Sequence, residues 1–285
     1  MTTSRNIQRT FQGVPTMEGA GVRLKRVFGH REAPLFDPFL LFDDFSADRP
    51  QDFIKGFPWH PHRGIETITY VLTGDVEHGD SLGNQGVISS GDVQWMTAGS
   101  GIIHQEMPKG DSQGRMAGFQ LWANLPASEK MMPPRYRGIK AGDIPEIQRD
   151  NGVVIRIICG TMDGVQGPAG DIVTDPAYMD ITIPTDTTHV QEVQKGHTAF
   201  SYIIQGQGRF DTASEKNIKK GELVLFADGD QIRVTASNEP LRFLLASGRP
   251  LKETVAWRGP IVMNTEEELK IAFEEYKNGT FIKHG

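Results

Sequence analysis

The sequence predicts an all-β protein made of two similar domains, with one short helix near the C-terminus. Its 32 glycines and 17 prolines are spread along 285 residues rather than clustered. They separate short segments rich in Val, Ile, Phe and Thr, which is typical of many short strands joined by turns. A strand-turn-strand pattern occurs twice in the chain, and a helical pattern occurs once. These three observations set the fold class.

The expected strands follow one another along most of the chain. Each is a short apolar or alternating segment bounded by turn residues, as a half-buried or fully buried strand requires. They occupy residues 21–29, 67–74, 86–96, 116–125, 152–160, 177–184, 200–210, 221–236 and 241–248.

The repeat is visible when the strands are compared. TYVLTG, which ends at Gly74, and SGDVQWM, from Ser90, recur as SYIIQG, which ends at Gly206, and KGELVLF, from Lys220. The copies lie 132 and 130 residues apart in the two segments. Self-similarity at one separation predicts a duplicated β unit. We therefore expect domains at residues 1–140 and 141–285, with a boundary in the polar, proline-containing stretch 135–152.

The helix is expected at the C-terminal end. Thr265 and Glu268 have the spacing of a capping box, and Gly279 is placed to end the helix. The apolar residues recur at helical spacing: Leu269, Ala272, Phe273 and Tyr276. We expect this helix to cover the second domain.

Composition excludes several classes of protein. A net charge of −6 with no lysine- and arginine-rich run argues against direct nucleic-acid binding. The N-terminus has no apolar signal region, and no apolar stretch is long enough to span a membrane. We expect a cytoplasmic protein, or a nuclear one if the source is eukaryotic. The single cysteine, Cys159, excludes an intrachain disulfide and is expected to be a buried, inert thiol.

Two histidine-containing pairs point to a metal site. His60 and His62 are two residues apart in an extended segment, so both imidazoles project from the same face. His104 and Glu106 form a second pair after a glycine-rich turn. Three neutral imidazoles and one carboxylate leave coordination positions open, which is typical of a catalytic or ligand-binding centre. Arg63 is expected on the opposite face, in a structural salt bridge.

The other histidines lack this context. We expect them to be structural or surface residues, with His78 in a turn. They are His30, His78, His189, His197 and His284.

These motifs resemble a known family. HPHRGIETITYVLTG and GDVQWMTAGSGIIHQE resemble the two cupin motifs. Their residues most closely resemble the form that these motifs take in the pirin family, a branch of the bicupins. The similarity extends to LFDDF at 41–45, HGDSLGNQG from His78, FQLWANLP from Phe119 and GPIVMNTEEELKIAFEEYKNGTF near the end. It spans nearly the whole chain.

The resemblance implies two cupin β-sandwich or barrel domains, of which only the N-terminal one binds metal. It implies one divalent ion per chain, usually iron, with Mn, Ni, Cu and Zn as alternatives. The ligands would be His60, His62, His104 and Glu106, and Glu66 is the alternative carboxylate of the general cupin pattern. The positions in the second copy that correspond to His60 and His62 fall near Glu192 and Gln194. Residues from segments that line the cavity in the family are Phe45, Phe57 and Gln120.

The resemblance also implies two functions of different classes. The first is a quercetin 2,3-dioxygenase type of reaction on a flavonol and O₂, with Glu106 as the catalytic base. The second is a redox-responsive regulatory protein that binds a transcription factor or a metabolic enzyme. A cupin isomerase or a small-molecule binder is a weaker third reading.

Overall fold

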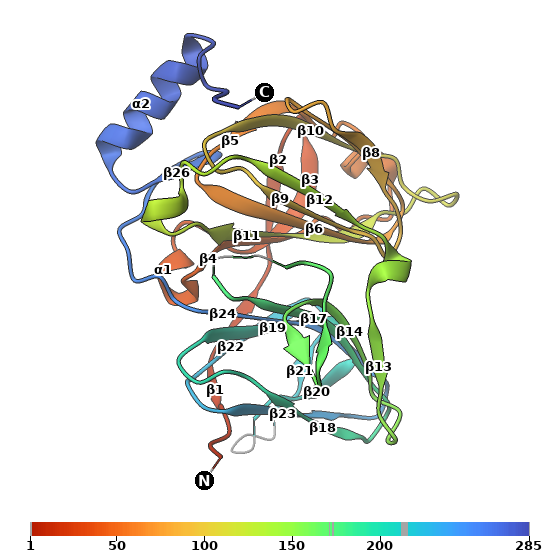
Figure 1. Cartoon of the computed structure of the whole chain (residues 1–285). Helices are drawn as coiled ribbons and strands as arrows, with labels where there is room; N and C mark the ends of the chain where they lie inside the picture. The colour runs from red at the N-terminus through yellow and green to blue at the C-terminus, as the bar shows by residue number, and fades with distance from the viewer. Residues whose placement is uncertain (1, 171, 173, 212–215, 285) are drawn as a thin grey trace. The chain divides into compact units, whose positions relative to one another are not determined.

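The computed structural model describes residues 2–170, 172, 174–211 and 216–284, and it confirms the all-β fold. The described chain divides into two compact units (Figure 1). The N-unit contains residues 14–34, 39–141 and 251–285, and the C-unit contains residues 1–13, 35–38 and 142–250. A short helix, α1 (Ala33–Phe36), lies where the chain passes from one unit to the other.

The N-unit is built from a seven-stranded sheet, a four-stranded sheet and a C-terminal hairpin, all antiparallel. The large sheet has the order β12-β9-β6-β11-β4-β3-β2, and the small sheet has the order β5-β10-β7-β8. The strands are β2 (Val14–Glu18), β3 (Val22–Phe28), β4 (Phe39–Asp44), β5 (Phe57–His62), β6 (Ile65–Thr73), β7 (Val76–Asp80), β8 (Gln85–Ile88), β9 (Val93–Thr97), β10 (Ile102–Pro108), β11 (Ala117–Asn124), β12 (Arg135–Ile139), β25 (Ala256–Arg258) and β26 (Ile261–Met263).

The C-unit has the same plan. Its large sheet has the order β1-β22-β19-β24-β17-β14-β13, its small sheet has the order β18-β23-β20-β21, and β15 pairs with β16. The strands are β1 (Ile7–Gln12), β13 (Glu146–Gln148), β14 (Val154–Cys159), β15 (Thr161–Met162), β16 (Val165–Gln166), β17 (Ala177–Ile183), β18 (Thr188–Glu192), β19 (Thr198–Gln205), β20 (Gln207–Arg209), β21 (Ile218–Lys219), β22 (Glu222–Phe226), β23 (Gln231–Ala236) and β24 (Leu241–Gly248).

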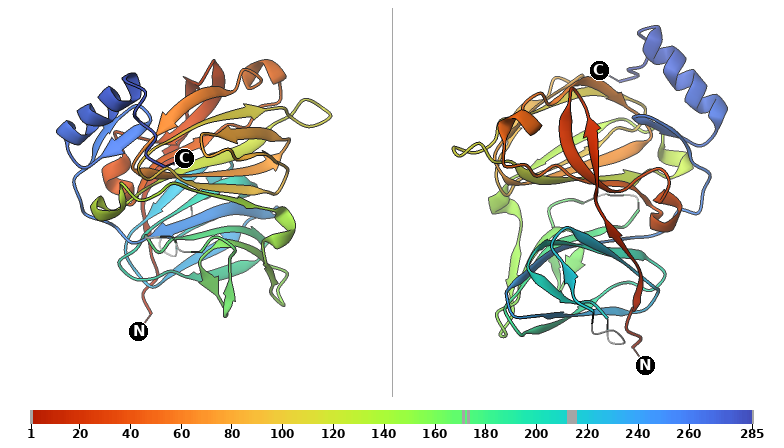
Figure 2. Two further views of the ribbon diagram at one scale, coloured as in Figure 1. Left: turned by 45° about the horizontal axis from the view of Figure 1, so that its top comes forward. Right: turned by 180° about the vertical axis from the view of Figure 1, so that it is seen from behind.

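The two sheet orders match position by position, so the repeat seen in the sequence is a repeat of structure. The units differ from the expected division into residues 1–140 and 141–285 at both chain ends. β1 forms the edge of the C-unit sheet beside β22, in the position that β12 occupies beside β9 (Figure 2, right). Residues 251–285 belong to the N-unit. Pairing between strands far apart in sequence leaves no local signal, which is why a contiguous division was expected.

Each unit has its own apolar core. In the C-unit the inward-facing residues of both sheets form one cluster that includes Ile155, Ile181, Val224 and Phe243. In the N-unit two smaller clusters surround the space between the sheets, one around Met96 and Trp122 and the other around Phe53 and Val71. The N-unit interior is therefore divided, and polar side chains occupy the part between its clusters.

The C-terminal helix α2 (Glu266–Lys277) begins at Thr265 with both hydrogen bonds of the capping box, as the sequence predicts. Its buried residues, Leu269 and Ala272, pack with Met263 of β26 and with Phe281. The expectation that this helix covers the second domain is wrong, because its contacts are to β25 and β26 in the N-unit (Figure 2, left). Among the described residues, no helix has the length and apolar character needed to cross a membrane.

Candidate metal centre

Three histidines from two neighbouring strands converge in the N-unit. His60 and His62 share a face of β5, and β10 places His104 directly opposite His60. One nitrogen from each imidazole lies within 4.8 Å of the others, so one metal ion could bind all three. His62 and His104 are buried, while His60 is only partly buried. Alternation along β5 and the cross-strand register therefore build the cluster that the spacing predicts.

Backbone carbonyls fix the orientation of two of these rings. His60 Nδ1 lies 2.8 Å from the Pro58 carbonyl, and His62 Nδ1 lies 3.0 Å from the Pro260 carbonyl. A carbonyl only accepts, so each Nδ1 carries the proton and each Nε2 presents a lone pair. The two Nε2 atoms are 3.1 Å apart. Two lone pairs facing each other at this distance repel unless a cation lies between them, so the donor set fits a bound metal ion.

Burial also keeps His62 and His104 neutral. Burial, and then the neighbouring His60, lowers the pKa of His62 to about 3, against the opposing effect of its hydrogen bond to Pro260. Burial and the nearby histidines place the pKa of His104 well below its usual value. Metal ligation requires neutral imidazole, so these surroundings favour the ligating form.

The two candidate carboxylates lie in different places. Glu106 faces the histidine cavity, and its oxygens accept hydrogen bonds from Thr69 Oγ1 at 3.0 Å and from Gln120 Nε2 at 3.1 Å. Its carboxylate oxygens are not part of the group of close donor atoms that the three histidines form. Glu66 accepts a hydrogen bond of 2.7 Å from Thr97. Alternation along β6 puts Glu66 on the opposite face from Thr69, so it does not point toward the histidines.

A cavity of about 460 Å³ opens onto His60 and His62. Its walls include Phe57 of β5 and Gln120 of β11, two of the residues expected there from the sequence. Phe45 lines a smaller adjoining pocket, which also contacts Phe57, Glu106 and Gln120. The remaining wall residues, which the sequence did not predict, include Arg26, Leu41, Asp43, Trp122 and Trp257.

Trp257 and Pro260 come from the C-terminal hairpin, so a segment far along the chain completes the site. The Trp122 and Trp257 rings lie 5.9 Å apart, and the His62 ring packs edge-on against Trp122 at 5.0 Å.

Arg63 is buried on the opposite face, as the alternation predicts. It contacts Glu275 Oε2 at 2.7 Å and donates to the Phe281 carbonyl at 2.8 Å. These contacts attach the end of the chain to the strand that carries His60 and His62.

The structure changes the interpretation of His78. This residue lies in strand β7 rather than in a turn, and its side chain is fully buried. Its ring is 5.6 Å from that of His104. His189 and His197 are buried in the C-unit, whereas His30 and His284 are exposed. The turn is formed after His78, by Asp80 and the residues that follow it.

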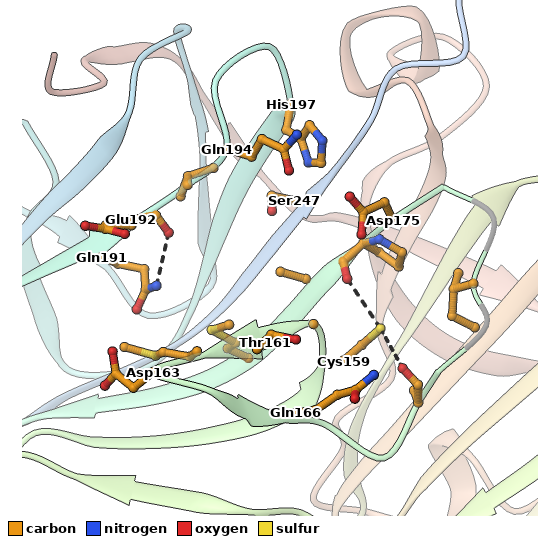
Figure 3. A pocket seen from close by; sticks show the side chains of 18 of the residues that line it. Cys159, Thr161, Asp163, Gln166, Asp175, Gln191, Glu192, Gln194, His197 and Ser247 are labelled. Carbon is orange, nitrogen blue, oxygen red and sulfur yellow. Dashed lines mark hydrogen bonds between the residues drawn. The ribbon is translucent and has the colours of Figure 1, made fainter. Parts of the chain in front are cut away.

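The C-unit contains its own cavity, of about 600 Å³. Figure 3 shows Gln191, Gln194, His197 and Ser247 around this space. Glu192 and Gln194, which correspond to the first histidine pair in the sequence repeat, both line it.

Cys159 is a buried free thiol whose Sγ donates to the Ala169 carbonyl at 3.1 Å, in keeping with a structural role. Within the described residues, the three N-unit histidines are the one group of three or more close metal-ligating side chains.

Comparison with known proteins places these features in context. Residues 21–123 match the pirin family, and residues 178–282 match the pirin C-terminal cupin domain. A pirin-like protein of Caulobacter vibrioides is 44% identical over 278 residues, which cover 97% of this chain and 99% of that protein. Human pirin is 38% identical and aligns with 98% of this chain and 94% of its own length. The crystal structure of a quercetin 2,3-dioxygenase from Acinetobacter baumannii superimposes with a TM-score of 0.88 at 31% identity, covering 98% of this chain and 99% of that one.

Proposed function

Because the chain belongs to the pirin family of cupin proteins, we propose that it is a metal-dependent dioxygenase that opens a flavonol such as quercetin with O₂. The observation that carries this proposal is the convergence of His60, His62 and His104 beside an aromatic-walled cavity. The similarity to a quercetin 2,3-dioxygenase over nearly the whole chain supports it.

We assign one divalent ion per chain to His60, His62, His104 and Glu106, with iron as the native metal. Iron is supported by the ligand set, since imidazole and carboxylate donors with open positions suit non-haem iron. When bound, the ion would supply Lewis-acid and redox chemistry to a chelating substrate and O₂. Glu106 would join the ligands through carboxylate lone pairs that the hydrogen bonds from Thr69 and Gln120 leave available.

The cavity suits a flat aromatic substrate. A volume of about 460 Å³ lies within the usual range for small-molecule sites. Trp122, Trp257 and Phe57 offer apolar walls, and Gln120 offers a polar group beside Glu106. Phe45 extends the apolar surface in the adjoining pocket. These side chains would hold the rings of a flavonol with its hydroxyl and carbonyl oxygens toward the histidines.

Glu106 is placed to take a proton from the substrate hydroxyl. Its two hydrogen-bond donors, Thr69 and Gln120, hold the carboxylate at the cavity wall. A flavonol hydroxyl that reached this carboxylate could transfer its proton there as it bound, which is general-base catalysis. Gln120 is itself held by Trp122, whose Nε1 donates to Gln120 Oε1 at 3.2 Å. The cavity wall therefore fixes the position of the base.

The test is anaerobic purification, metal analysis, and measurement of oxygen uptake with flavonols and catechols. We expect about one iron per chain and oxygen-dependent loss of flavonol absorbance. His62→Ala should abolish metal binding with the fold retained. Glu106→Gln should reduce turnover by about 100-fold or more if the carboxylate is the base, and Glu192→Gln in the C-unit cavity is the matched control. An iron-loaded wild type that consumes no oxygen with any of these compounds would refute the dioxygenase assignment.

A further inference from the structure

A second histidine-carboxylate pair lies behind the metal ligands and is not used by the proposed reaction. The cross-strand register of β7 and β10 places Asp80 opposite His104 and His78 opposite Glu106. Cross-strand partners project to the same face, so all four side chains point into the interior. The side chains of His78 and Asp80 are both 0% exposed, and His78 Nε2 lies 3.3 Å from Asp80 Oδ2.

Asp80 is held in place as a charged acceptor. It accepts hydrogen bonds from the backbone N–H of Leu82 at 2.9 Å and from the backbone and side-chain N–H of Asn84 at 3.0 and 2.9 Å. Burial raises the pKa of Asp80, but the hydrogen bonds from His78 and Asn84 outweigh it, and the net pKa is lowered. A carboxylate oxygen only accepts, so His78 carries its proton on Nε2. In the neutral imidazole, Nδ1 of His78 is then the acceptor.

The matching donor is on His104. Neither ring nitrogen of His104 has a hydrogen-bond partner among the described residues, and the same holds for His78 Nδ1. If one His104 nitrogen binds the ion, the other carries a proton and needs an acceptor, which metal-ligating histidines almost always have. The ring centroids of His78 and His104 are 5.6 Å apart, so the rings are neighbours, but their nitrogens do not hydrogen-bond directly. One water molecule is the simplest bridge between such a donor and such an acceptor.

We propose that His78, held by Asp80, is a positioning residue for the metal ligand His104 through one buried water. The water would accept the N–H of His104 and donate to Nδ1 of His78, while Nε2 of His78 donates to Asp80. Each hydrogen bond in this chain has one donor and one acceptor, and together they fix the tautomer and orientation of His104. This role rests on the metal site of the proposed function, but not on its substrate.

Packing is the alternative explanation for a buried His78. Its ring stacks on Tyr136, with the centroids 4.9 Å apart and the planes inclined by 25°. His78→Phe keeps a ring for this stacking and removes the acceptor nitrogen. His78→Gln removes the ring and keeps an amide that can both accept and donate. The two variants therefore separate packing from hydrogen bonding.

The C-unit offers a matched control. Counted as whole residues, His189 and His78 are 5% and 4% exposed. His189 Nε2 also contacts the side chain two residues later, Gln191, at 3.2 Å. His189→Phe therefore makes the same change to a buried histidine in the unit that lacks the histidine group. Its loss of stability measures the cost of the substitution alone.

The experiment is titration of the metal-free full-length chain with Co²⁺, followed by the visible absorption spectrum and the dissociation rate of the ion. We expect His78→Phe to weaken binding by about 10- to 100-fold and to alter the spectrum. His78→Gln should restore part of the affinity, and His189→Phe should match the wild type. A crystal structure of the loaded wild type should show a water within hydrogen-bonding distance of both rings.

Other outcomes would overturn the inference. If His78→Phe binds Co²⁺ with the affinity and spectrum of the wild type, His78 only packs. If both His78 variants fail to fold, a loaded wild-type structure without that water refutes the chain of hydrogen bonds. A wild type that binds no Co²⁺ removes the metal site and this inference together. A wild type that binds Co²⁺ as expected, but whose iron form consumes no oxygen, refutes only the dioxygenase assignment.

Discussion

Lys130 should make the stability of the protein depend on pH in the alkaline range. It is buried in the N-unit, and its Nζ donates to the Gly64 carbonyl at 2.9 Å and to Asn124 Oδ1 at 2.5 Å. A neutral amine has two N–H donors, which these two acceptors satisfy. Burial lowers the pKa of Lys130 from 10.5 to about 7, although Glu253 and Glu268 favour the charged form.

The direction of the effect follows from the order of the two pKa values. The folded pKa is the lower one, so between about pH 7 and 10.5 the unfolded chain binds more protons than the folded chain. Stability therefore rises with pH across this window. The separation between the two values corresponds to about 5 kcal/mol of destabilisation at low pH. About 3 kcal/mol of this should be recovered between about pH 6 and about pH 9.5.

The measurement is the free energy of unfolding in urea for the metal-free wild type and Lys130→Met at several pH values. Methionine keeps an unbranched chain and cannot titrate, so the wild type should gain about 3 kcal/mol relative to the variant as the pH rises. Lys140→Met is the control, because the Lys140 side chain is 63% exposed. Parallel stability curves for the wild type and Lys130→Met would show that Lys130 stays charged in the folded protein.

Two further predictions concern Arg63, which binds Glu275 of the C-terminal helix, and Gly64, whose carbonyl accepts a hydrogen bond from Lys130. Arg63→Met should destabilise the protein by about 3–5 kcal/mol, because it removes the buried guanidinium that contacts both Glu275 and the Phe281 carbonyl. Glu275→Gln should cost only about 1–3 kcal/mol, since glutamine keeps an oxygen that can accept the hydrogen bond from Arg63; equal losses in urea unfolding would contradict this asymmetry. Gly64→Ala should lower the melting temperature far more than Gly83→Ala. Both glycines have positive φ, but an added Cβ collides with the Val262 carbonyl only at Gly64. Equal melting temperatures would disprove it.

The convergence of the three histidines could be predicted from the sequence because their geometry is largely local. His60 and His62 are two residues apart on one strand, and the helix start at Thr265 depends on a residue three positions later. The hydrogen-bond acceptor of His62 could not be predicted from the sequence, because Pro260 lies 198 residues away along the chain. His78 was predicted in a turn but lies in strand β7. The turn that the segment predicts does exist, but it begins two residues later, at Asp80, whose carboxylate accepts hydrogen bonds from the backbone of Leu82 and Asn84.

The compact units differ from the expected domains at the chain ends for a similar reason. Turn and alternation patterns identify strands but do not say which sheet an end strand joins. β1 pairs with β22 through backbone hydrogen bonds that any extended segment could make, and its side chains are mostly half-buried or exposed. The repeat located the matching strands β6 and β19, because both copies keep a glycine after them. We call this arrangement the exchange of ends: the first strand belongs to the C-unit, and residues 251–285 belong to the N-unit. It could be recognised only once the strand pairing was known.

This exchange of ends bears on how the protein is made. A ribosome delivers His60 and His62 early, but the carbonyl of Pro260 and the partners of Arg63 are synthesised 198 or more residues later. Arg63 and Phe281 are 218 residues apart, which is about 10–40 s of synthesis at ordinary translation rates. Until then the first cupin barrel has its histidines without the hairpin that orients one of them. The hairpin can therefore orient His62 only after all the strands of the second barrel have been synthesised.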